Sequence, residues 1–539
     1  MKIFTLLIVF FLSSVFCEAQ DPVSGRSMLF STDVIVHTKA SENQRHPKIA
    51  SAFNGWLYAA NTINDTSSKK GGIYLSISKD NGATWNKLAT YQFSNSFYQF
   101  TDVAVAGPDT AHLGVFLAGT LHNTLNGTNS LYIDKFDGRN GNLLNGQVFA
   151  RNLGTLSVTD MAVSTDNQFP SSYSAPYGIS IVYGLHGGTE DSLLYASSTD
   201  GGLTFEVQNT IAHSTHAFRK VALAYGKSPA IPGGAYFVSW EVLQNTASTL
   251  GHIYLAHTHT DITAGWGNPV CLDSLSSALN NLCRYPSLSC QQSTTNNDAG
   301  DISVIVSFEK ASGGNMNNMD IAGCATKRGV SANLWVPFIE AGSPENDLEP
   351  SLAYNTGTNH FLITYFDSTN GRIGMAAQDM NLSSLSSWNY LTTQLNDQRS
   401  NLKAPWPVVG INLQLQQPCC LWVSENPGNQ NGIVLFDAEY AGVATAVVNV
   451  APSENRIGNL YPNPASGRIT LPLTLQESQK LYMVIYDMLG NIVREQEIPM
   501  MAAGNQTATM DISELENGIY FCHAETEGMK RIIRFAVQH

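Results

Sequence analysis

Seven short segments of the chain begin in the same way, and this repetition limits the possible folds more than any other feature. In each segment two residues, mostly polar or proline, precede an apolar residue and then a small one. The first and last segments start 360 residues apart, so the mean interval is 60 residues. Such a repeat indicates an array of equivalent structural units. The segments are residues 47–50, 101–104, 159–162, 219–222, 286–289, 350–353 and 407–410.

Each repeat has the pattern of a small group of β-strands. The start of a repeat is followed by a second apolar run, such as residues 236–240, and most repeats contain a third, such as residues 73–77. Charged residues make up only 13% of the chain, aromatic residues make up 10%, and no long helical periodicity is present. Three or four short strands per unit, repeated seven times, predict an all-β chain that forms a seven-bladed β-propeller.

The ends of the array bear on the blade count and on ring closure. A six-bladed ring is the alternative, because the second unit has only a degenerate turn at residues 137–141 and the seventh has no such turn. Residues 33–37 form a strand-like run before the first unit. We expect this run to be the outer strand of the last blade, where it would cover two sheet edges at once.

Two turns share one pattern of side chains, and both follow an apolar run. The aspartate of the pattern accepts hydrogen bonds from turn N–H groups, the glycine permits a positive φ, and the aromatic side chain anchors the returning strand. The two sets are Ser78, Asp80, Gly82, Thr84 and Trp85, and Ser198, Asp200, Gly202, Thr204 and Phe205.

This pattern resembles the Asp-box, or BNR, repeat of sialidase-like β-propellers. The resemblance implies that the boxes lie on hairpins remote from the ligand face. It also implies three arginines that bind a carboxylate, a Tyr nucleophile activated by a Glu, and an Asp acid/base. Arg45, Arg219 and Arg284 are the candidates for the triad. The Arg-x-Pro spacing at Arg45 and Arg284 lacks the aromatic residue that precedes the arginine in the family, and no Tyr/Glu pair can be assigned.

Charged residues gather at one predicted face. Antiparallel blades place the start of the first strand and the end of the second on one face, and the box hairpins on the other. We therefore expect the site on the first of these faces, although such charges also pair across an axis only to satisfy one another. The candidates for ligand contacts are Arg45, Asp102, Asp160, Arg219, Arg284 and Trp406, and those for catalytic carboxylates are Glu241, Glu309, Glu349 and Asp367.

The preferred hypothesis is a propeller that binds glycan or protein ligands through its axial face. The alternative is an exo-acting glycoside hydrolase of sialidase-like type, and a carboxylate pair would also suit another glycosidase or a lyase. The fold does not choose between binding and catalysis. We expect no cofactor, because no G-x-S-x-G, H-E-x-x-H, Walker or G-x-G-x-x-G pattern is present.

The repeat pattern stops near residue 440, and we expect three parts in the mature chain. Residues 20–440 form the propeller, residues 441–458 a linker, and residues 459–539 a small antiparallel sandwich of alternating strands and turns. Within the last part, the order of Y-P-N-P, D-x-L-G and N-G-I-Y resembles the type A sorting domain of the type IX secretion system. The resemblance implies export through that machinery to the cell surface or the medium.

The first residues predict export as well. Lys2, an apolar run and a small residue at position 19 are typical of a signal peptide over residues 1–19, which is too short to span a membrane. Lipid attachment at Cys17 is the alternative, but Phe16 is bulky where small residues are preferred. The formal net charge of −14 argues against a nucleic-acid partner, and no other run is long enough for a transmembrane segment.

The cysteines predict no metal site. After removal of the signal peptide an odd number, seven, remains, and no pair has C-x-x-C spacing. Cys271 and Cys283 bracket one loop and are candidates for a disulfide in an oxidising compartment. The imidazoles of His257 and His259 more often indicate a solvated strand than metal binding.

Overall fold

The computed structural model divides the chain into two compact units, residues 1–445 and 446–539. The predicted signal peptide and most of the predicted linker lie outside the described residues. The structure describes residues 29–30, 33–37, 42–65, 70–107, 109–166, 177–205, 207–245, 250–258, 265–275, 279, 283–292, 301–311, 315, 318–327, 329–330, 335–339, 346–379, 389–392, 395–396, 402, 404–425, 431–440, 456–458, 460–475, 478–488, 490–501, 504–526 and 529–539.

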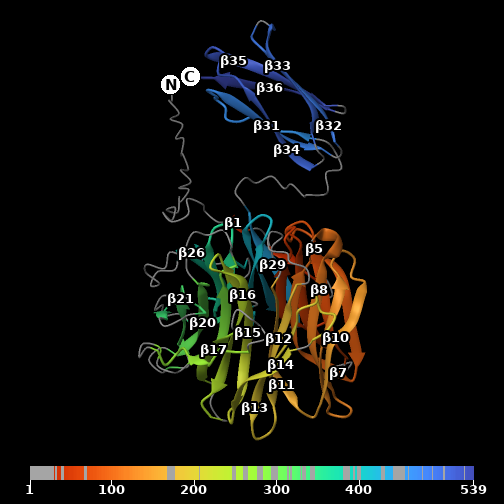
Figure 1. The fold of residues 1–539 in the computed structure, drawn as a ribbon, viewed down its shortest axis with the longest axis vertical. Coiled ribbons are helices and arrows are strands. Elements are labelled where there is room, and N and C mark those ends of the chain that lie inside the picture. The colour runs from red at the N-terminus through yellow and green to blue at the C-terminus, as the bar shows by residue number, and fades with distance from the viewer. Residues whose placement is uncertain are drawn as a thin grey trace, which may run out of the picture. The chain divides into compact units, whose positions relative to one another are not determined.

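The described part of the first unit is built almost entirely of antiparallel strands, as predicted (Figure 1). Apart from two single bridges that link neighbouring groups, hydrogen-bond pairing divides the described strands of this unit into six groups of four and a last group of three strands with two short strands at its edge; each group is called a blade below. Blade 1 contains β3 (Gln44–Ser51), β4 (Leu57–Asp65), β5 (Lys70–Ser78) and β6 (Asn86–Ser94). Blade 2 contains β7 (Ser96–Ala106), β8 (Gly114–Asn123), β9 (Asn129–Asp137) and β10 (Leu143–Gly154), with the short 3-10 helix η1 (Thr110–His112).

The next three blades have the same order of strands. Blade 3 contains β11 (Ser157–Thr165), β12 (Ile179–His186), β13 (Asp191–Ser198) and β14 (Val207–Ser214). Blade 4 contains β15 (Phe218–Ser228), β16 (Ile231–Leu243), β17 (Gly251–His257) and β18 (Val270–Cys271). Blade 5 contains β19 (Cys283–Cys290), β20 (Val304–Ala311), β21 (Met319–Thr326) and β22 (Val336–Ile339).

The last two blades complete the ring. Blade 6 contains β23 (Asp347–Asn355), β24 (His360–Asp367), β25 (Arg372–Asp379) and β26 (Asn389–Thr392). Blade 7 contains β27 (Val408–Asn412), β28 (Gln417–Glu425) and β29 (Gly432–Tyr440), and its outer edge pairs with β1 (Leu29–Phe30) and β2 (Val34–Ile35). The outer strand of the last blade therefore comes from the run at residues 33–37, as predicted. This pairing protects the edge of β29.

The first strand of each blade packs on the first strand of the next, and β27 packs on β3. The cores lie between neighbouring blades. One cluster, for example, joins Phe116 of blade 2 to Ile179 and Tyr183 of blade 3, and all three are almost completely buried. Burial of both faces explains why the strands are nearly continuous apolar runs, and it makes each blade depend on its neighbours for stability.

Side-chain acceptors in one blade also bind backbone N–H groups at or near the first strand of the next blade. The N–H group of Val163 in blade 3 donates to Asp102 in blade 2 at 2.9 Å, and Val221 in blade 4 donates to Asp160 in blade 3 at 2.8 Å. Further bonds of this kind cross from blade 4 to 5, from 5 to 6 and from 6 to 7. Their donor and acceptor residues are Tyr285 and Glu241, Glu349 and Glu309, Leu352 and Ser287, Trp406 and Glu349, and Val409 and Ser351.

The two box-like turns have matching hydrogen bonds. In the first, Asp80 accepts from the hydroxyl of Ser78 at 2.8 Å and from the N–H and hydroxyl groups of Thr84 at 2.9 and 2.5 Å. Asp200 accepts the equivalent bonds in the second turn. Gly82 adopts φ +87°, and a Cβ there would overlap the ring of Phe436. The turns therefore need both the carboxylate and the glycine.

The strand register places these turns away from the start of the first strand. Ser51 at the end of β3 pairs with Leu57, and Leu57 pairs with Ser78 directly before the turn. Gln44 at the start of β3 pairs with Ile63 near the end of β4. The predicted separation of the two faces is confirmed for this blade.

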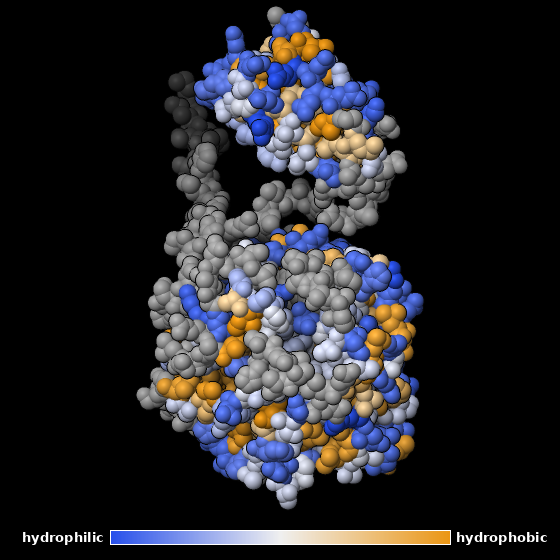
Figure 2. Space-filling view, in the orientation of Figure 1, coloured by the Kyte–Doolittle hydropathy of each residue, from blue (hydrophilic) through white to orange (hydrophobic). Residues whose placement is uncertain are grey.

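The second unit is a two-sheet sandwich. One sheet contains β30 (Arg456–Ile457), β31 (Arg468–Leu475) and β34 (Gly504–Asp511). The other contains β33 (Ile492–Met501), β32 (Gln479–Tyr486), β35 (Gly518–Thr526) and β36 (Met529–Val537) in that order. Alternating residues such as Ile469, Leu471 and Leu481 fill the core between the sheets. Hydrophilic side chains are widespread on the visible surface of each unit (Figure 2).

Replacing Asp80 or Asp200 by alanine should lower the free energy of unfolding of the first unit by about 1–3 kcal/mol, because turn N–H and hydroxyl groups lose their acceptor. Urea denaturation followed by tryptophan fluorescence measures this, since all eight tryptophans precede residue 446. Asp511→Ala is the matched control, because Asp511 accepts similar bonds from Ser513 in the second unit. An unchanged fluorescence transition in both box variants would contradict the role of the turns.

Candidate functional site

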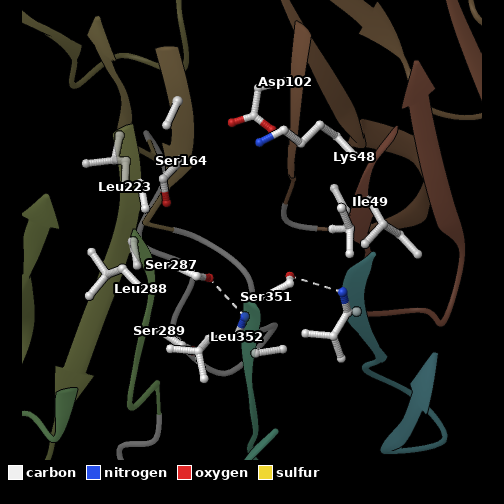
Figure 3. A pocket seen from close by; sticks show the side chains of 18 of the residues that line it. Lys48, Ile49, Asp102, Ser164, Leu223, Ser287, Leu288, Ser289, Ser351 and Leu352 are labelled. Carbon is white, nitrogen blue, oxygen red and sulfur yellow. Dashed lines mark hydrogen bonds between the residues drawn. The ribbon is translucent and has the colours of Figure 1, made fainter. Parts of the chain in front are cut away.

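The first strands of all seven blades enclose a cavity of about 550 Å³ (Figure 3). Its walls carry small and hydroxyl side chains, such as Ser164, Ser287 and Ser351, between apolar ones. In the close view, Lys48 of blade 1 and Asp102 of blade 2 point toward one another. The cavity has the size of a small-ligand site, and its lining is contributed by every blade.

Five residues at the starts of first strands adopt a left-handed backbone conformation, and all five line the cavity. Their φ angles lie between +38° and +56°, which non-glycine residues rarely adopt. They come from blades 1, 4, 5, 6 and 7, and they are called the rim residues below. They are His46, Lys220, Tyr285, Glu349 and Trp406.

The rim residues have a common local origin. Four of them directly precede a proline, and the strand register slips at the starts of β3, β15, β19 and β23, as in a β-bulge. A bulge redirects a side chain that would otherwise follow the strand. Each left-handed residue costs on the order of 1–3 kcal/mol, so such residues persist only where their surroundings hold them, and they cluster at functional sites.

Buried carboxylates hold three of the rim residues. Glu241 accepts the N–H of Tyr285 at 3.2 Å, Glu309 accepts the N–H of Glu349 at 2.7 Å, and Glu349 accepts the N–H of Trp406 at 2.7 Å. Glu241 and Glu309 are at most 1% exposed. These bonds are the contacts between blades described above, so one set of glutamates both joins the ring and fixes the conformation of the rim.

Burial shifts the pKa values of these glutamates upward. Burial is the main cause that raises the pKa of Glu241 to about 7, and repulsion from Glu309 adds to it. Burial and repulsion from Glu309 likewise raise the pKa of Glu349 to about 7. The pKa of Glu309 is also raised, although Arg284 opposes the shift. Glu241 and Glu349 are therefore partly protonated at neutral pH, where exposed glutamates are ionised.

Cations and aromatic rings meet at the rim. The guanidinium of Arg45 lies 5.5 Å from the ring centre of Trp406, and the ring of His46 lies 4.7 Å from the same ring. The ammonium of Lys220 lies 5.6 Å from the ring of Tyr285. Burial, with the nearby charges of Lys220, Lys48 and Arg45, lowers the pKa of His46 to about 4, so His46 is neutral at neutral pH.

The three arginines of the predicted triad have different surroundings. Arg284 forms an ion pair with Glu309 at 2.5 Å and lies 5.1 Å from the ring of Tyr285. Arg219 is opposite Glu241 in the pairing of β15 with β16. Arg45 lies over Trp406 instead. The strands of blades 4 and 5 thus bring two of the arginines beside one group of glutamates, while the third belongs to the other side of the rim.

The remaining candidates divide into cavity and turn residues. Asp102 and Asp160 line the cavity, and burial is the largest influence that raises the pKa of Asp102. Asp367 does not line it. Its carboxylate binds Arg372 at 2.6 Å and accepts turn N–H groups between β24 and β25. Asp367 is therefore a structural residue of a hairpin.

His46, Lys48, Lys220 and Tyr285 line the cavity but were not among the residues predicted from the sequence. The available signal was the x-Pro pair at the starts of first strands, whose x residue faces the cavity in four blades. Cys271 and Cys283, the candidates for a disulfide, are not bonded to each other. The thiol of Cys271 donates to Asp273, and the thiol of Cys283 donates to the carbonyl of Leu279.

Comparisons with known proteins identify one part of the chain. Residues 459–538 match the family model described as a secretion system C-terminal sorting domain, so the second unit is a sorting domain. No curated protein matches the sequence. Among the described residues, no helix has the length and apolarity needed to cross a membrane.

Several solved structures share a distant likeness with the chain. A variant of an α-L-arabinofuranosidase from Fusarium graminearum, in complex with an iminosugar inhibitor, is 8% identical with a TM-score of 0.42, over 76% of this chain and 97% of that one. The polysaccharide lyase Uly1 is 7% identical with a TM-score of 0.42, over 78% and 94%. A protein of unknown function from Dyadobacter fermentans is 12% identical with a TM-score of 0.40, over 77% and 99%. Likenesses this weak carry no argument about the present chain.

The raised pKa values predict that the first unit loses stability as the pH rises. Because the folded pKa of Glu241 and Glu349 is about 7 and the unfolded value is 4.5, the folded state binds more protons between these limits. The free energy of unfolding should fall from pH 5 to 7 by up to about 1.4 kcal/mol per pH unit for each group. Glu241→Gln should remove its share of this slope, as measured by urea denaturation at several pH values.

The exposed Glu190 in blade 3 supplies the control, since Glu190→Gln should leave the slope unchanged. The readout is the slope of the unfolding free energy against pH, not the stability at one pH. The Oε1 atom of Glu241 has no hydrogen-bond partner among the described residues. A glutamine NH₂ group at that position would also lack a partner, so it should lower stability at every pH. Equal slopes in the wild type and Glu241→Gln would show that Glu241 does not hold a proton in the folded state.

Proposed function

We propose that the chain is an exported, surface-associated propeller that binds an acidic glycan in its axial cavity, at the rim residues. The main support for the proposal is the set of rim residues: five residues with a left-handed backbone conformation at the starts of first strands, all of which line one cavity. Strained residues grouped in this way indicate a binding or active site. The chemistry of the groups around them favours a ligand with negative charge.

The balance of available charges supports an anionic ligand. Glu241 and Glu349 accept backbone N–H groups, and pKa values of about 7 reduce their negative charge near neutral pH, while the charge of Glu309 is paired with Arg284. Lys48 and Lys220 line the cavity, and Lys220 is exposed. Lys48 points toward Asp102, whereas Lys220 interacts at longer range with Glu309 and Glu349. A carboxylate on a sugar would therefore meet the exposed ammonium group of Lys220 at the rim.

Two aromatic rings at the rim favour a sugar over a simple anion. Trp406 and Tyr285 are half-buried, and each already lies beside a cation, so each ring is positioned with one partner. Large aromatic side chains supply apolar contact area at low entropic cost and stay partly open to solvent. Rings and ammonium groups on one rim would contact both the apolar face of a sugar and its acidic substituent.

A glycoside hydrolase of sialidase-like type is the alternative, and one observation favours it. Tyr285 lies close to Glu241, Glu309 and two arginines, a combination that resembles the Tyr/Glu and arginine groups of that family. Burial, however, raises the pKa of Tyr285, which opposes its use as a nucleophile, and Arg284 is already paired with Glu309. Only Glu349 of the buried glutamates lines the cavity. We therefore prefer binding over cleavage.

The sorting domain supports the export part of the proposal. We propose that residues 459–539 interact with the type IX secretion machinery and that the propeller is presented at the cell surface or released. A sorting domain that folds as a separate unit, with its own core, is suited to recognition independent of the cargo.

Lys220→Ala should weaken the binding of an acidic oligosaccharide by about 1.5–3 kcal/mol, the range for a hydrogen bond to a charged group. The loss of binding free energy should be smaller at high salt, because salt screens the charge. The probes are oligogalacturonate and a neutral galacto-oligosaccharide of equal length, compared by calorimetry with the mature chain. Lys87→Ala, on an exposed outer strand of blade 1, is the control and should change nothing. Equal affinity for the acidic and neutral probes would contradict anion recognition.

The same samples distinguish binding from cleavage. Retention of the acidic probe without released sugar supports a binding protein. Released sugar that disappears in Glu349→Gln, while probe affinity survives, would instead establish the hydrolase or lyase, since an acid/base group acts chiefly in the transition state.

Removing residues 459–539 should abolish delivery of the propeller to the surface in a bacterium that carries type IX secretion. The truncated chain should remain folded, because the first unit has its own cores. Surface labelling and cell fractionation measure the location, and protease resistance of the retained chain checks its folding. Normal surface display of the truncated chain would disprove the sorting role.

A further inference from the structure

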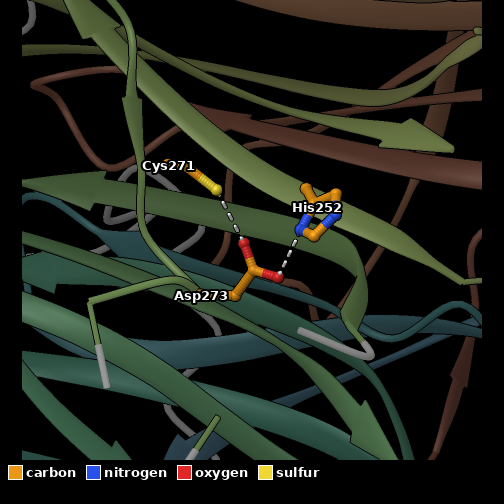
Figure 4. A group of neighbouring side chains, drawn as sticks. All are labelled: His252, Cys271 and Asp273. Carbon is orange, nitrogen blue, oxygen red and sulfur yellow. Dashed lines mark hydrogen bonds and ion pairs between the residues drawn. The ribbon is translucent and has the colours of Figure 1, made fainter. Parts of the chain in front are cut away.

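Three side chains of blade 4 form a compact group with metal-binding chemistry (Figure 4). The Nδ1 atom of His252 lies 3.1 Å from the Oδ2 atom of Asp273, and the Sγ atom of Cys271 lies 3.2 Å from its Oδ1 atom. Their ligand atoms all lie within 4.8 Å of one another. Four ligands around a zinc ion at about 2.0–2.3 Å are separated by roughly 3.3–3.8 Å, so small movements would fit an ion between them.

The group is built at a contact between blades 4 and 5. His252 lies at the start of β17, and Cys271 in β18 pairs with Tyr254 of the same strand. Leu272, between the two other ligands in sequence, is fully buried and accepts a bond from the thiol of Cys324 in blade 5. An ion held here would fix the segment after β18 to both blades.

The group of His252, Cys271 and Asp273 also lies next to the strands that carry two of the groups around the rim. Asp273 accepts the N–H of Ile253 at 3.0 Å, and Ile253 pairs with Glu241 across β16 and β17. Gly251, before His252, pairs with Cys283, the neighbour of Arg284. The group therefore lies behind the strands that carry Glu241 and Arg284, outside the cavity lining.

We propose that His252, Cys271 and Asp273 bind one thiophilic divalent cation, Zn²⁺, and that the ion braces blade 4 against blade 5. The donor set of imidazole, thiolate and carboxylate is one that zinc accepts and that magnesium and calcium do not favour. The thiol proton that Cys271 donates to Asp273 passes to solvent when the ion binds. Asp273 is fully buried, whereas the side chain of His252 is 33% exposed, so a water molecule has access to the fourth position.

The proposed site would be an exception to the prediction of no metal, which rested on the absence of C-x-x-C spacing. Cys271 and Asp273 are separated by one residue, whereas His252 lies far from both in the sequence. The pairing of β18 with β17 brings the three residues together. The inference does not depend on glycan binding, because the group lies outside the cavity.

The experiment uses the mature chain, stripped with EDTA and titrated with Zn²⁺ and with Co²⁺. One equivalent should bind, Co²⁺ should give a thiolate charge-transfer absorption, and excess Zn²⁺ should raise Tm by a few degrees. His252→Gln should lose the Zn²⁺-dependent rise while its Tm in EDTA stays close to that of the wild type. His257→Gln, at the other end of β17, is the matched control and should keep the rise.

Asp273→Asn, which changes the buried ligand, should also lose the Zn²⁺-dependent rise in Tm. If Asp273→Asn does not fold, His252→Gln still tests the site. Two results would overturn the proposal: no stoichiometric ion, or a Zn²⁺ effect on Tm that is equal in the wild type and in His252→Gln. Either result would show that the group is a hydrogen-bond network around Asp273 and nothing more.

Discussion

The first unit depends on hydrogen bonds from the backbone of one blade to a side chain of the preceding one. Asp102, Asp160 and Glu241 each accept an N–H group from the first strand of the following blade. Apolar contacts between blades supply most of the stabilisation, but they are not directional. The polar bonds set how the first strands lie against one another, and so they set the shape of the cavity that those strands enclose.

This arrangement gives the buried glutamates a positioning role. The N–H groups of Tyr285, Glu349 and Trp406 belong to left-handed residues, and each is bound by a glutamate. A hydrogen bond of this kind offsets part of the backbone strain. Glu241 and Glu309 are buried, and the residues that they hold, Tyr285 and Glu349, line the cavity. Raised pKa values are a signature of catalytic carboxyls, but burial in a structural contact produces them equally well.

The sequence predicted the fold because its signals are local and repeated. The signals are the short apolar runs of the strands, the box turns at Asp80 and Asp200, and the run at residues 33–37. Each of these signals specifies structure within a few residues. The face that holds the site followed from antiparallel geometry. Ten side chains were selected on that basis. Asp102, Asp160, Glu349 and Trp406 line the cavity, whereas the other six do not: Arg45, Arg219, Arg284, Glu241, Glu309 and Asp367.

The parts that the sequence did not predict depend on partners from other blades. Glu241 and Glu309 were chosen as catalytic candidates, but their hydrogen bonds run to first strands that begin about forty residues later. Tyr285 looked like an ordinary strand residue, since the conformation that turns it toward the axis depends on the bulge around it. Cys271 and His252 meet only because the outer strand of blade 4 returns to β17.

The rim residues are proposed to bind an acidic sugar, and a crystal structure of the mature chain with bound oligogalacturonate would locate the sugar carboxylate itself. We expect this carboxylate within hydrogen-bond distance of the ammonium group of Lys220 or Lys48, with a sugar face against Trp406 or Tyr285. A ligand bound at the box-turn face, or in the cavity with its carboxylate turned away from both lysines, would contradict this proposal.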